Sequence, residues 1–252
     1  MTRLSWVLLC SAALFAATSA QADTVHDAAA DFSTTVNTDS SMWSYRISTT
    51  PAHDGADVLL PAFGVFAGFT GPPAGTSGWR VAGVPAIGLN STGADQFFIG
   101  FGPGAQFTWP AGALYMHPGA ATLAVVSWRS PTAAWLTISA RFADIDANRN
   151  FGDGVAWSVE KNSGANTLAA GSFANGGNSG AISLSNILVA AGDRIRFVVG
   201  NNGDYQGDSS SLVATITASP VPEPASWMLA LAGACLLLRW RPAAASARPR
   251  HA

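Results

Sequence analysis

The chain has 252 residues, of which 48% are hydrophobic and only 11% are charged, with 26 Gly and 14 Pro. Long exposed helices need many charged side chains on their wet faces, so this composition argues against a helical protein. Between residues 23 and 222, eight Lys and Arg stand against fourteen Asp and Glu, a net charge of −6 that argues against nucleic-acid binding.

Residues 1–22 are typical of a signal peptide. Arg3 precedes the apolar run 4–17, and Ala20-Gln-Ala22 is the small-residue pattern that signal peptidase cleaves. We therefore expect export with signal peptidase as a partner and cleavage after Ala22, or alternatively after Ala20. A buried N-terminal helix is the other interpretation, but the charge, the length and the cleavage pattern together favour export.

Alternation of apolar and polar residues predicts β-strands in the middle of the chain. It is clearest at 135–142 and returns at 155–159, 194–199 and 212–216, which indicates strands with one dry and one wet face. Further strands are expected at Trp43–Ile47, Val58–Phe66, Phe97–Phe101 and Ala121–Trp128. Gly-rich turns separate these stretches, so we expect residues 23–220 to form one all-β domain, an antiparallel β-sandwich or jelly roll.

A polar segment of this domain carries oxygen-bearing side chains at alternate positions, followed by one more acid: Asp144, Asp146, Asn148, Asn150 and Asp153. Loops gather hard cations such as Ca²⁺ with this pattern. An EF-hand is excluded, because Arg149 and Val155 occupy the positions that require Gly and Glu. Asp and Asn also favour turns for their own sake, so the alternatives are a Ca²⁺ site and an ordinary polar connection. No other cofactor is expected.

Trp79 and Trp109 are the candidates for carbohydrate binding. Both lie among Gly and Pro residues outside the alternating stretches, so we expect exposed rings that could stack on the apolar face of a sugar. The alternative is that they fill the ends of the sandwich. Glycoside hydrolysis needs a pair of carboxylates, and Glu160 is the only Glu of the domain. We therefore predict no catalytic residues and a protein that is not an enzyme.

Residues 221–252 have three parts in a fixed order. The stretch Pro222–Pro224 is followed by the apolar run 225–238 and then by a basic end, 239–252, that contains no acid. The apolar run is shorter than the roughly 20 residues of a stable membrane span. The basic end is expected to stay in the cytoplasm, which leaves the Pro-Glu-Pro stretch at the outer face of the inner membrane. A plain C-terminal membrane anchor is the alternative to this transient transmembrane helix.

This tail resembles the PEP-CTERM sorting signal of Gram-negative bacteria. The residues that carry the resemblance are Pro222, Glu223, Pro224, Arg239 and Arg241. The resemblance implies processing by an exosortase and an association with exopolysaccharide and biofilm. It further implies a final place at the cell surface, on the outer membrane or in the extracellular matrix. It says nothing about the activity of the domain that the tail carries.

The stretch from Trp43 to Thr217 resembles a β-sandwich family of secreted bacterial proteins. Its landmarks are Trp43–Tyr45, Pro85–Asn90, His117–Gly119, Ser127–Arg129, Gly192–Asp193, Phe197–Asn201 and Asp208. The resemblance implies a jelly-roll-like extracellular domain that is associated with carbohydrate binding. We therefore expect an exported, non-catalytic protein that binds or organises polysaccharide. The alternatives are a polysaccharide hydrolase and a purely structural or ice-binding surface protein.

Overall fold

Every named element of the protein is a β-strand. The computed structural model describes residues 22–50, 53, 56–66, 75–99, 105–148, 150–221 and 233. Ala22–Pro220 forms one unit that contains all of the strands. The predicted signal helix and transmembrane helix fall outside the described residues, apart from Ala22 and Gly233. In the described ranges, no helix combines the length and the apolar character that a membrane crossing requires.

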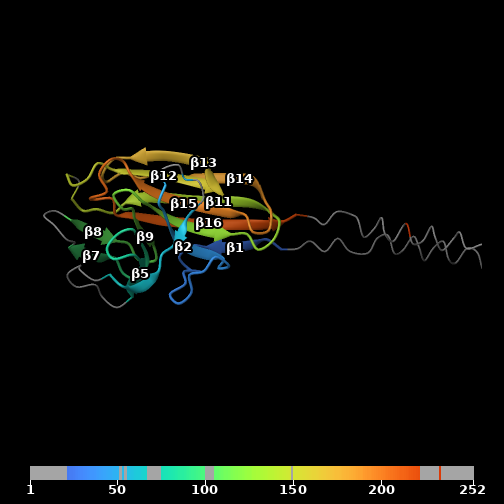
Figure 1. Ribbon diagram of the computed structural model, residues 1–252, viewed down its shortest axis with the longest axis horizontal. Helices are drawn as coiled ribbons and strands as arrows, with labels where there is room; N and C mark the ends of the chain where they lie inside the picture. Colours follow the sequence, from blue (N-terminus) through green and yellow to red (C-terminus); the bar gives the residue numbers. More distant parts are fainter. Residues whose placement is uncertain are drawn as a thin grey trace, which may run out of the picture. The chain divides into compact units, whose positions relative to one another are not determined.

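Two antiparallel sheets form a sandwich (Figure 1). The first sheet has eight strands, in the order β14 (Ile182–Val189), β11 (Ala134–Asp144), β16 (Ser210–Pro220), β9 (Leu114–His117), β6 (Ala86–Asn90), β5 (Thr76–Arg80) and β4 (Ala62–Val65), with β1 (Thr24–Asp27) also paired to β16. The second has six, in the order β13 (Ser163–Phe173), β12 (Val155–Lys161), β15 (Arg194–Asn201), β10 (Leu123–Arg129), β2 (Trp43–Ser48) and β3 (Val58–Leu59). A separate hairpin pairs β7 (Gln96–Ile99) with β8 (Gln106–Trp109).

The chain changes sheet at most connections from β10 onward. β10, β12, β13 and β15 belong to the second sheet, whereas β11, β14 and β16 belong to the first. Connections of this kind are found in jelly rolls, where neighbouring strands come from distant parts of the sequence. β11 and β16 pair along their whole lengths, with Asp144 opposite Ser210 and Ala134 opposite Pro220. The segment that follows β11 therefore begins beside the segment that precedes β16.

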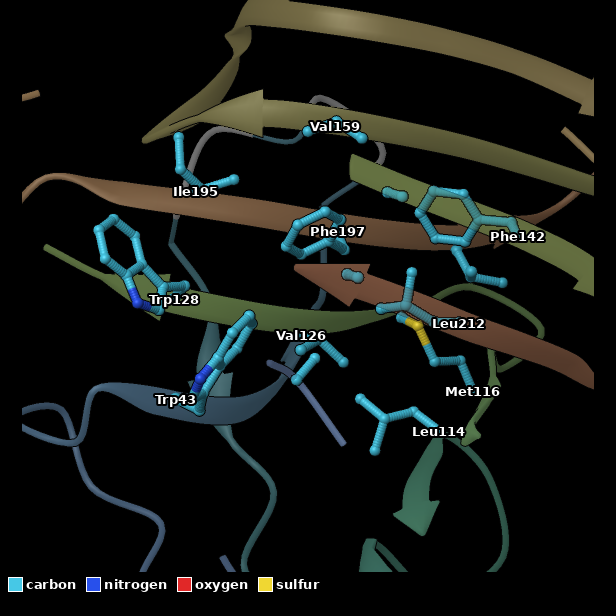
Figure 2. Packing of buried hydrophobic residues seen from close by; sticks show 14 of the residues in the cluster. Trp43, Leu114, Met116, Val126, Trp128, Phe142, Val159, Ile195, Phe197 and Leu212 are labelled. Atoms are coloured by element: carbon cyan, nitrogen blue, oxygen red, sulfur yellow. The ribbon is translucent and has the colours of Figure 1, made fainter. Parts of the chain in front are cut away.

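The core lies between the inward faces of the two sheets. In β11, buried Leu136, Ile138 and Phe142 alternate with exposed residues, as the alternation predicts. Phe142 lies on the first sheet, and Trp128 and Phe197 on the second; Figure 2 shows their side chains converging from the two sides. Burying each such side chain contributes about 1.5–3 kcal/mol, so a domain without a disulfide can be stable.

A second hydrophobic cluster, here called the aromatic cluster, lies under the hairpin of β7 and β8. Its members are Phe66, Ala86, Phe98, Phe107, Trp109, Tyr115 and Ile145. The rings of Phe98 and Phe107 stack with centroids 4.8 Å apart, and the ring of Trp109 lies 5.2 Å from that of Tyr115. The hairpin thus buries its inner face against β9 instead of joining either large sheet.

The alternating stretches at 135–142, 155–159, 194–199 and 212–216 are confirmed as parts of β11, β12, β15 and β16. The stretch 58–66 is divided into the short strands β3 and β4, which belong to different sheets. β13 and β14 have no counterpart among the predicted strands. β13 consists largely of small residues and is mostly exposed or half-buried, so it lacks the apolar alternation that marks a strand with one dry face.

Candidate functional site

Two loops meet beside the paired ends of β11 and β16. Loop 145–154 follows β11, and loop 202–209 precedes β16. The amide of Ile145 donates to the carbonyl of Ser209 over 2.9 Å, and the amide of Ser209 donates to Asp146 Oδ2 over 2.7 Å. Strand pairing therefore continues as direct hydrogen bonding between the loops and fixes the position of Asp146.

Two glycines allow the loops to approach each other closely. Gly152 has a φ of +95° and Gly207 a φ of +75°, in the left-handed region that favours glycine. A Cβ on Gly152 would collide with the carbonyl of Gln206, and a Cβ on Gly207 would collide with the carbonyl of Phe151. The contact is thus between two backbones and leaves no room for side chains.

A cavity of about 400 Å³ lies against these loops, and we call it the Tyr205 cavity. The residues that matter most for its chemistry are Phe107, Tyr115, His117, Asp146, Tyr205 and Gln206. Phe107 and Tyr115 belong to the aromatic cluster, whereas Tyr205 and Gln206 come from loop 202–209. The wall therefore combines apolar ring surface with hydroxyl, amide and carboxyl groups.

His117 presents a neutral imidazole to this cavity. Burial lowers the pKa of His117 to about 4, and the hydrogen bond with the backbone of Pro118 opposes that change. His117 Nδ1 lies 2.7 Å from the Pro118 carbonyl, which can only accept, so Nδ1 carries the proton. Nε2 is then an acceptor. The His117 and Tyr205 rings meet edge to face, with centroids 6.4 Å apart.

Two aspartates at this end of the sandwich bind their protons tightly. Burial, followed by the charge of Asp144, raises the pKa of Asp146 to about 7. Burial, followed by the charges of Asp153 and Asp146, raises the pKa of Asp208 to about 8. Only Asp146 of these residues lines the Tyr205 cavity. Near neutral pH its carboxyl can therefore act as a hydrogen-bond donor as well as an acceptor.

A second hollow, of about 530 Å³, lies on the outer face of the second sheet and is called here the outer groove. Ala156 pairs with Gly200 and Ser158 pairs with Val198 in the floor of this groove. Glu160 at its side makes a 2.6 Å hydrogen bond with Ser158 Oγ. The floor is mainly of small residues, and its acid already has protein partners.

Those partners form a buried ionic network beneath residues 53–57. Arg196 is fully buried and pairs with Glu160, and its Nε and a terminal nitrogen bind the two carboxylate oxygens of Asp57 over 2.9 and 2.6 Å. His53 Nδ1 lies 2.5 Å from Glu160 Oε1. Burial alone would raise the pKa of Glu160, but hydrogen bonds with His53 and Ser158 and the charge of Arg196 lower it. The network stabilises the fold and leaves Glu160 no acid role.

The prediction that Trp79 and Trp109 have exposed rings is wrong. Trp79 is 8% exposed, its indole N–H donates to the Ser33 carbonyl, and its ring packs against Phe63. Trp109 is 1% exposed and its N–H donates to the Ala113 carbonyl. The hairpin and the N-terminal segment cover these positions, which is the alternative in which the rings fill the ends of the sandwich.

The structure divides the predicted Asp and Asn set. Asp144 and Asp146 remain together, and Asp144 Oδ1 accepts from the Asp146 amide over 2.8 Å. Asn148 Oδ1 instead accepts from the Asn150 amide, which is an ordinary turn. Asp153 is exposed and binds the amide of Asp204. Over the described ranges, no three His, Cys, Asp or Glu side chains are already assembled as a metal-binding group.

Trp135 is an aromatic residue that the sequence analysis placed on a wet strand face but did not select as a site. It is 42% exposed on β11, opposite Leu188 on one side and Ser219 on the other. Its position in the alternation was sufficient to find it. Of the predicted processing residues, Ala22 lies exposed just before β1, whereas Ala20, Pro222, Glu223, Pro224, Arg239 and Arg241 lie outside the described residues.

No protein-family model matches the chain, and no curated protein matches it. A family 36 carbohydrate-binding module in complex with calcium and xylotriose is 19% identical over 44% of this chain and 82% of its own, with a TM-score of 0.26. A family 29 carbohydrate-binding module is 11% identical over 52% of this chain and 86% of its own, with a TM-score of 0.27.

The M60 catalytic domain with its two CBM51 domains from Clostridium perfringens ZmpB is 13% identical. This match covers 78% of this chain and 20% of that one, with a TM-score of 0.37. Solved structures similar to this chain therefore include carbohydrate-binding modules. At these TM-scores the likeness carries no information about what this protein binds, so the function has to be argued from its own residues.

Proposed function

We propose that this protein is an exported, non-catalytic surface or matrix protein that binds polysaccharide in the Tyr205 cavity. The observation that carries the proposal is the mixed wall of that cavity. Sugars have apolar C–H faces that stack on rings and hydroxyls that exchange hydrogen bonds, and few cavities supply both. This one offers the ring of Tyr205 beside the side chains of Gln206 and Asp146.

The polar groups of the cavity are available to a ligand. Gln206 is exposed at the rim, and Tyr205 is half-buried. Nε2 of His117 is an acceptor, because the other ring nitrogen donates to Pro118. Glu160 in the outer groove is, by contrast, engaged by Arg196, His53 and Ser158. The Tyr205 cavity is therefore the better site for a ligand that is rich in hydroxyl groups.

Binding is favoured over hydrolysis by the carboxyl groups of the cavity. A glycosidase places two carboxyl groups on either side of the scissile bond, about 5–10 Å apart. Of the residues that line the Tyr205 cavity, Asp146 is the single acid in the part of the chain that the structure describes. A raised pKa would suit Asp146 as a proton donor, but the second carboxylate that would attack or activate water is missing from this wall.

The route to the surface is a separate part of the proposal and rests on the two ends of the chain. Signal peptidase would release the N-terminus after Ala22, and an exosortase would process the tail near Pro222–Pro224. Intact-mass spectrometry of the protein from a PEP-CTERM host tests this. A mature chain that begins at Asp23 and lacks the basic end supports the proposal, and a chain that keeps residues 239–252 would contradict it.

Polysaccharide binding is tested with Ala22–Pro220, which contains all the strands and both hydrophobic clusters. Exopolysaccharide and plant polysaccharides are offered in affinity electrophoresis and calorimetry, and release of reducing ends is measured in parallel. We expect Tyr205→Ala and Gln206→Ala to weaken binding at least tenfold without reducing-end release. Stacking and hydrogen bonding to one sugar each contribute on the order of 1–2 kcal/mol.

Trp135→Ala is the matched control, because it removes an exposed ring from the far end of β11. Unchanged binding in Trp135→Ala places the ligand in the cavity. Loss in Trp135→Ala with none in Tyr205→Ala would move the site to the outer face of the first sheet and overturn the proposal. Reducing ends released by the wild type but not by Asp146→Asn would favour the hydrolase.

A further inference from the structure

Asp208 is a buried carboxyl group without a hydrogen-bond partner. Its residue is 0% exposed, and neither Oδ1 nor Oδ2 has a partner in the described part of the protein. Burying an unpaired carboxylate is very costly, and even a neutral polar group costs about 1–3 kcal/mol when it is left unsatisfied. Unpartnered polar groups of this kind are uncommon in folded proteins and indicate that something is missing from the site.

The charges around Asp208 make the deficit larger. The groups that act on it electrostatically are all carboxylates: Asp153, Asp146, Asp204 and Asp144. The ion pairs formed among the described residues lie elsewhere, on Asp39, Asp57, Glu160 and Asp193. Negative charge therefore accumulates here without a compensating Lys, Arg or His among them.

Hydrogen bonds hold the neighbouring carboxylates in place and leave oxygen atoms available. Asp146 is 8% exposed, and its Oδ2 accepts from the amide of Ser209, the residue that follows Asp208. Asp144 accepts from the amides of Asp146 and Gly176 through its two oxygens. The backbone bonds orient these groups toward the meeting point of the two loops, where Asp208 lies. Asp208 is the one that no hydrogen bond restrains.

We propose that Asp146 and Asp208 bind a Ca²⁺ ion between loops 145–154 and 202–209, with Asp144 adding negative charge beside it. Ca²⁺ takes six to eight oxygen ligands from carboxylates, peptide carbonyls and water, and it tolerates irregular geometry. Two carboxylates with carbonyl and water oxygens meet this need without a third acidic ligand. The ion supplies Asp208 with a partner and joins the two loops that form the rim of the Tyr205 cavity.

This site differs from the one that the alternate-position pattern predicted. Asn148, Asn150 and Asp153 take no direct part, and Asp208 comes from 62 positions after Asp146 in the chain. The inference does not depend on sugar binding. A cation at Asp146 and Asp208 would stabilise the loops whether or not the Tyr205 cavity is occupied.

The test uses Ala22–Pro220 freed of metal with a chelator. CaCl₂ is titrated in by calorimetry, and thermal unfolding is followed with and without Ca²⁺. We expect one ion per chain with a dissociation constant on the order of 0.1–1 mM, the range of extracellular modules, and a higher midpoint temperature with Ca²⁺. MgCl₂ should bind at least tenfold more weakly, because Mg²⁺ requires near-octahedral geometry.

Asp208→Asn keeps the shape of the side chain and removes its charge. We expect it to weaken Ca²⁺ binding at least tenfold and, without Ca²⁺, to unfold at the same temperature as the wild type or higher. Asp23→Asn, an exposed aspartate at the start of the domain, is the matched control and should bind as the wild type does. If Asp208→Asn fails to fold by circular dichroism, Asp146→Asn takes its place.

A wild-type domain that shows no heat and no thermal shift in 10 mM CaCl₂ would overturn the inference, and Asp208 would then be a buried neutral acid. Equal binding by the wild type and Asp208→Asn would overturn it as well. Ca²⁺ binding without polysaccharide binding would leave this inference standing and refute only the proposed function. Polysaccharide binding that is unaffected by chelator, in a domain that binds no Ca²⁺, would do the reverse.

Discussion

Replacing Arg196 with Met removes the centre of the buried ionic network. Met has a similar length, so the aliphatic part of the side chain keeps its packing while the guanidinium is lost. Asp57 then loses a two-point interaction, and Glu160 loses its ion pair but keeps His53 and Ser158. Both carboxylates stay buried, with side chains 4% and 1% exposed.

The expected cost follows from the burial of these two carboxylates. Removing one partner of a buried ion pair destabilises a protein by about 3–5 kcal/mol, because the remaining charge stays in a poorly hydrated site. We expect Arg196→Met to lower the free energy of unfolding by about 4 kcal/mol. With a urea m-value of about 2.5 kcal/mol/M, the midpoint of unfolding falls by roughly 1.6 M.

Urea unfolding of Ala22–Pro220, followed by tryptophan fluorescence at pH 7.5, measures this loss. Arg141→Met is the control, since Arg141 is exposed on β11, and its effect should stay within about 0.5 kcal/mol. Adding Glu160→Gln and Asp57→Asn to Arg196→Met should recover a large part of the loss, because no buried charge is left unpaired. A loss below 1 kcal/mol for Arg196→Met would refute the claim that these carboxylates are withdrawn from water.

In the absence of Ca²⁺, the stability advantage of Asp208→Asn over the wild type should grow as the pH rises from about 5 to about 8. The folded wild type holds the Asp208 proton with a pKa of about 8, whereas the unfolded chain releases it near 4, so the folded state binds more protons in this window and loses stability as the pH rises, by up to about 1.4 kcal/mol per pH unit. Urea unfolding of both proteins at several pH values measures the difference, and a difference that does not change with pH would contradict it. Trp109→Ala should lower the free energy of unfolding by about 3–5 kcal/mol, because it empties the centre of the aromatic cluster. The same titration measures this, and a loss under 1 kcal/mol would mean that the hairpin of β7 and β8 does not cover Trp109.

The sequence by itself determined the fold class and the boundaries of most central strands. Alternation marks a strand when one face is dry and the other is wet, and β11 meets this condition along its length. β13 does not, because its Ser, Gly, Ala and Thr residues pack against little, so its place in the sheet comes from pairing with β12. Composition and local pattern are sufficient only where a strand itself separates core from solvent.

Only the tertiary structure decided which residues form the candidate site. Trp109 lies among Gly and Pro in the sequence, and it is buried because a hairpin that no local pattern predicts closes over it. Asp146 and Asp208 are brought together by the pairing of β11 with β16, strands that neither local spacing nor composition relates. Burial and the proximity of like charges depend on the whole sandwich, and they give an ordinary turn aspartate its unusual chemistry.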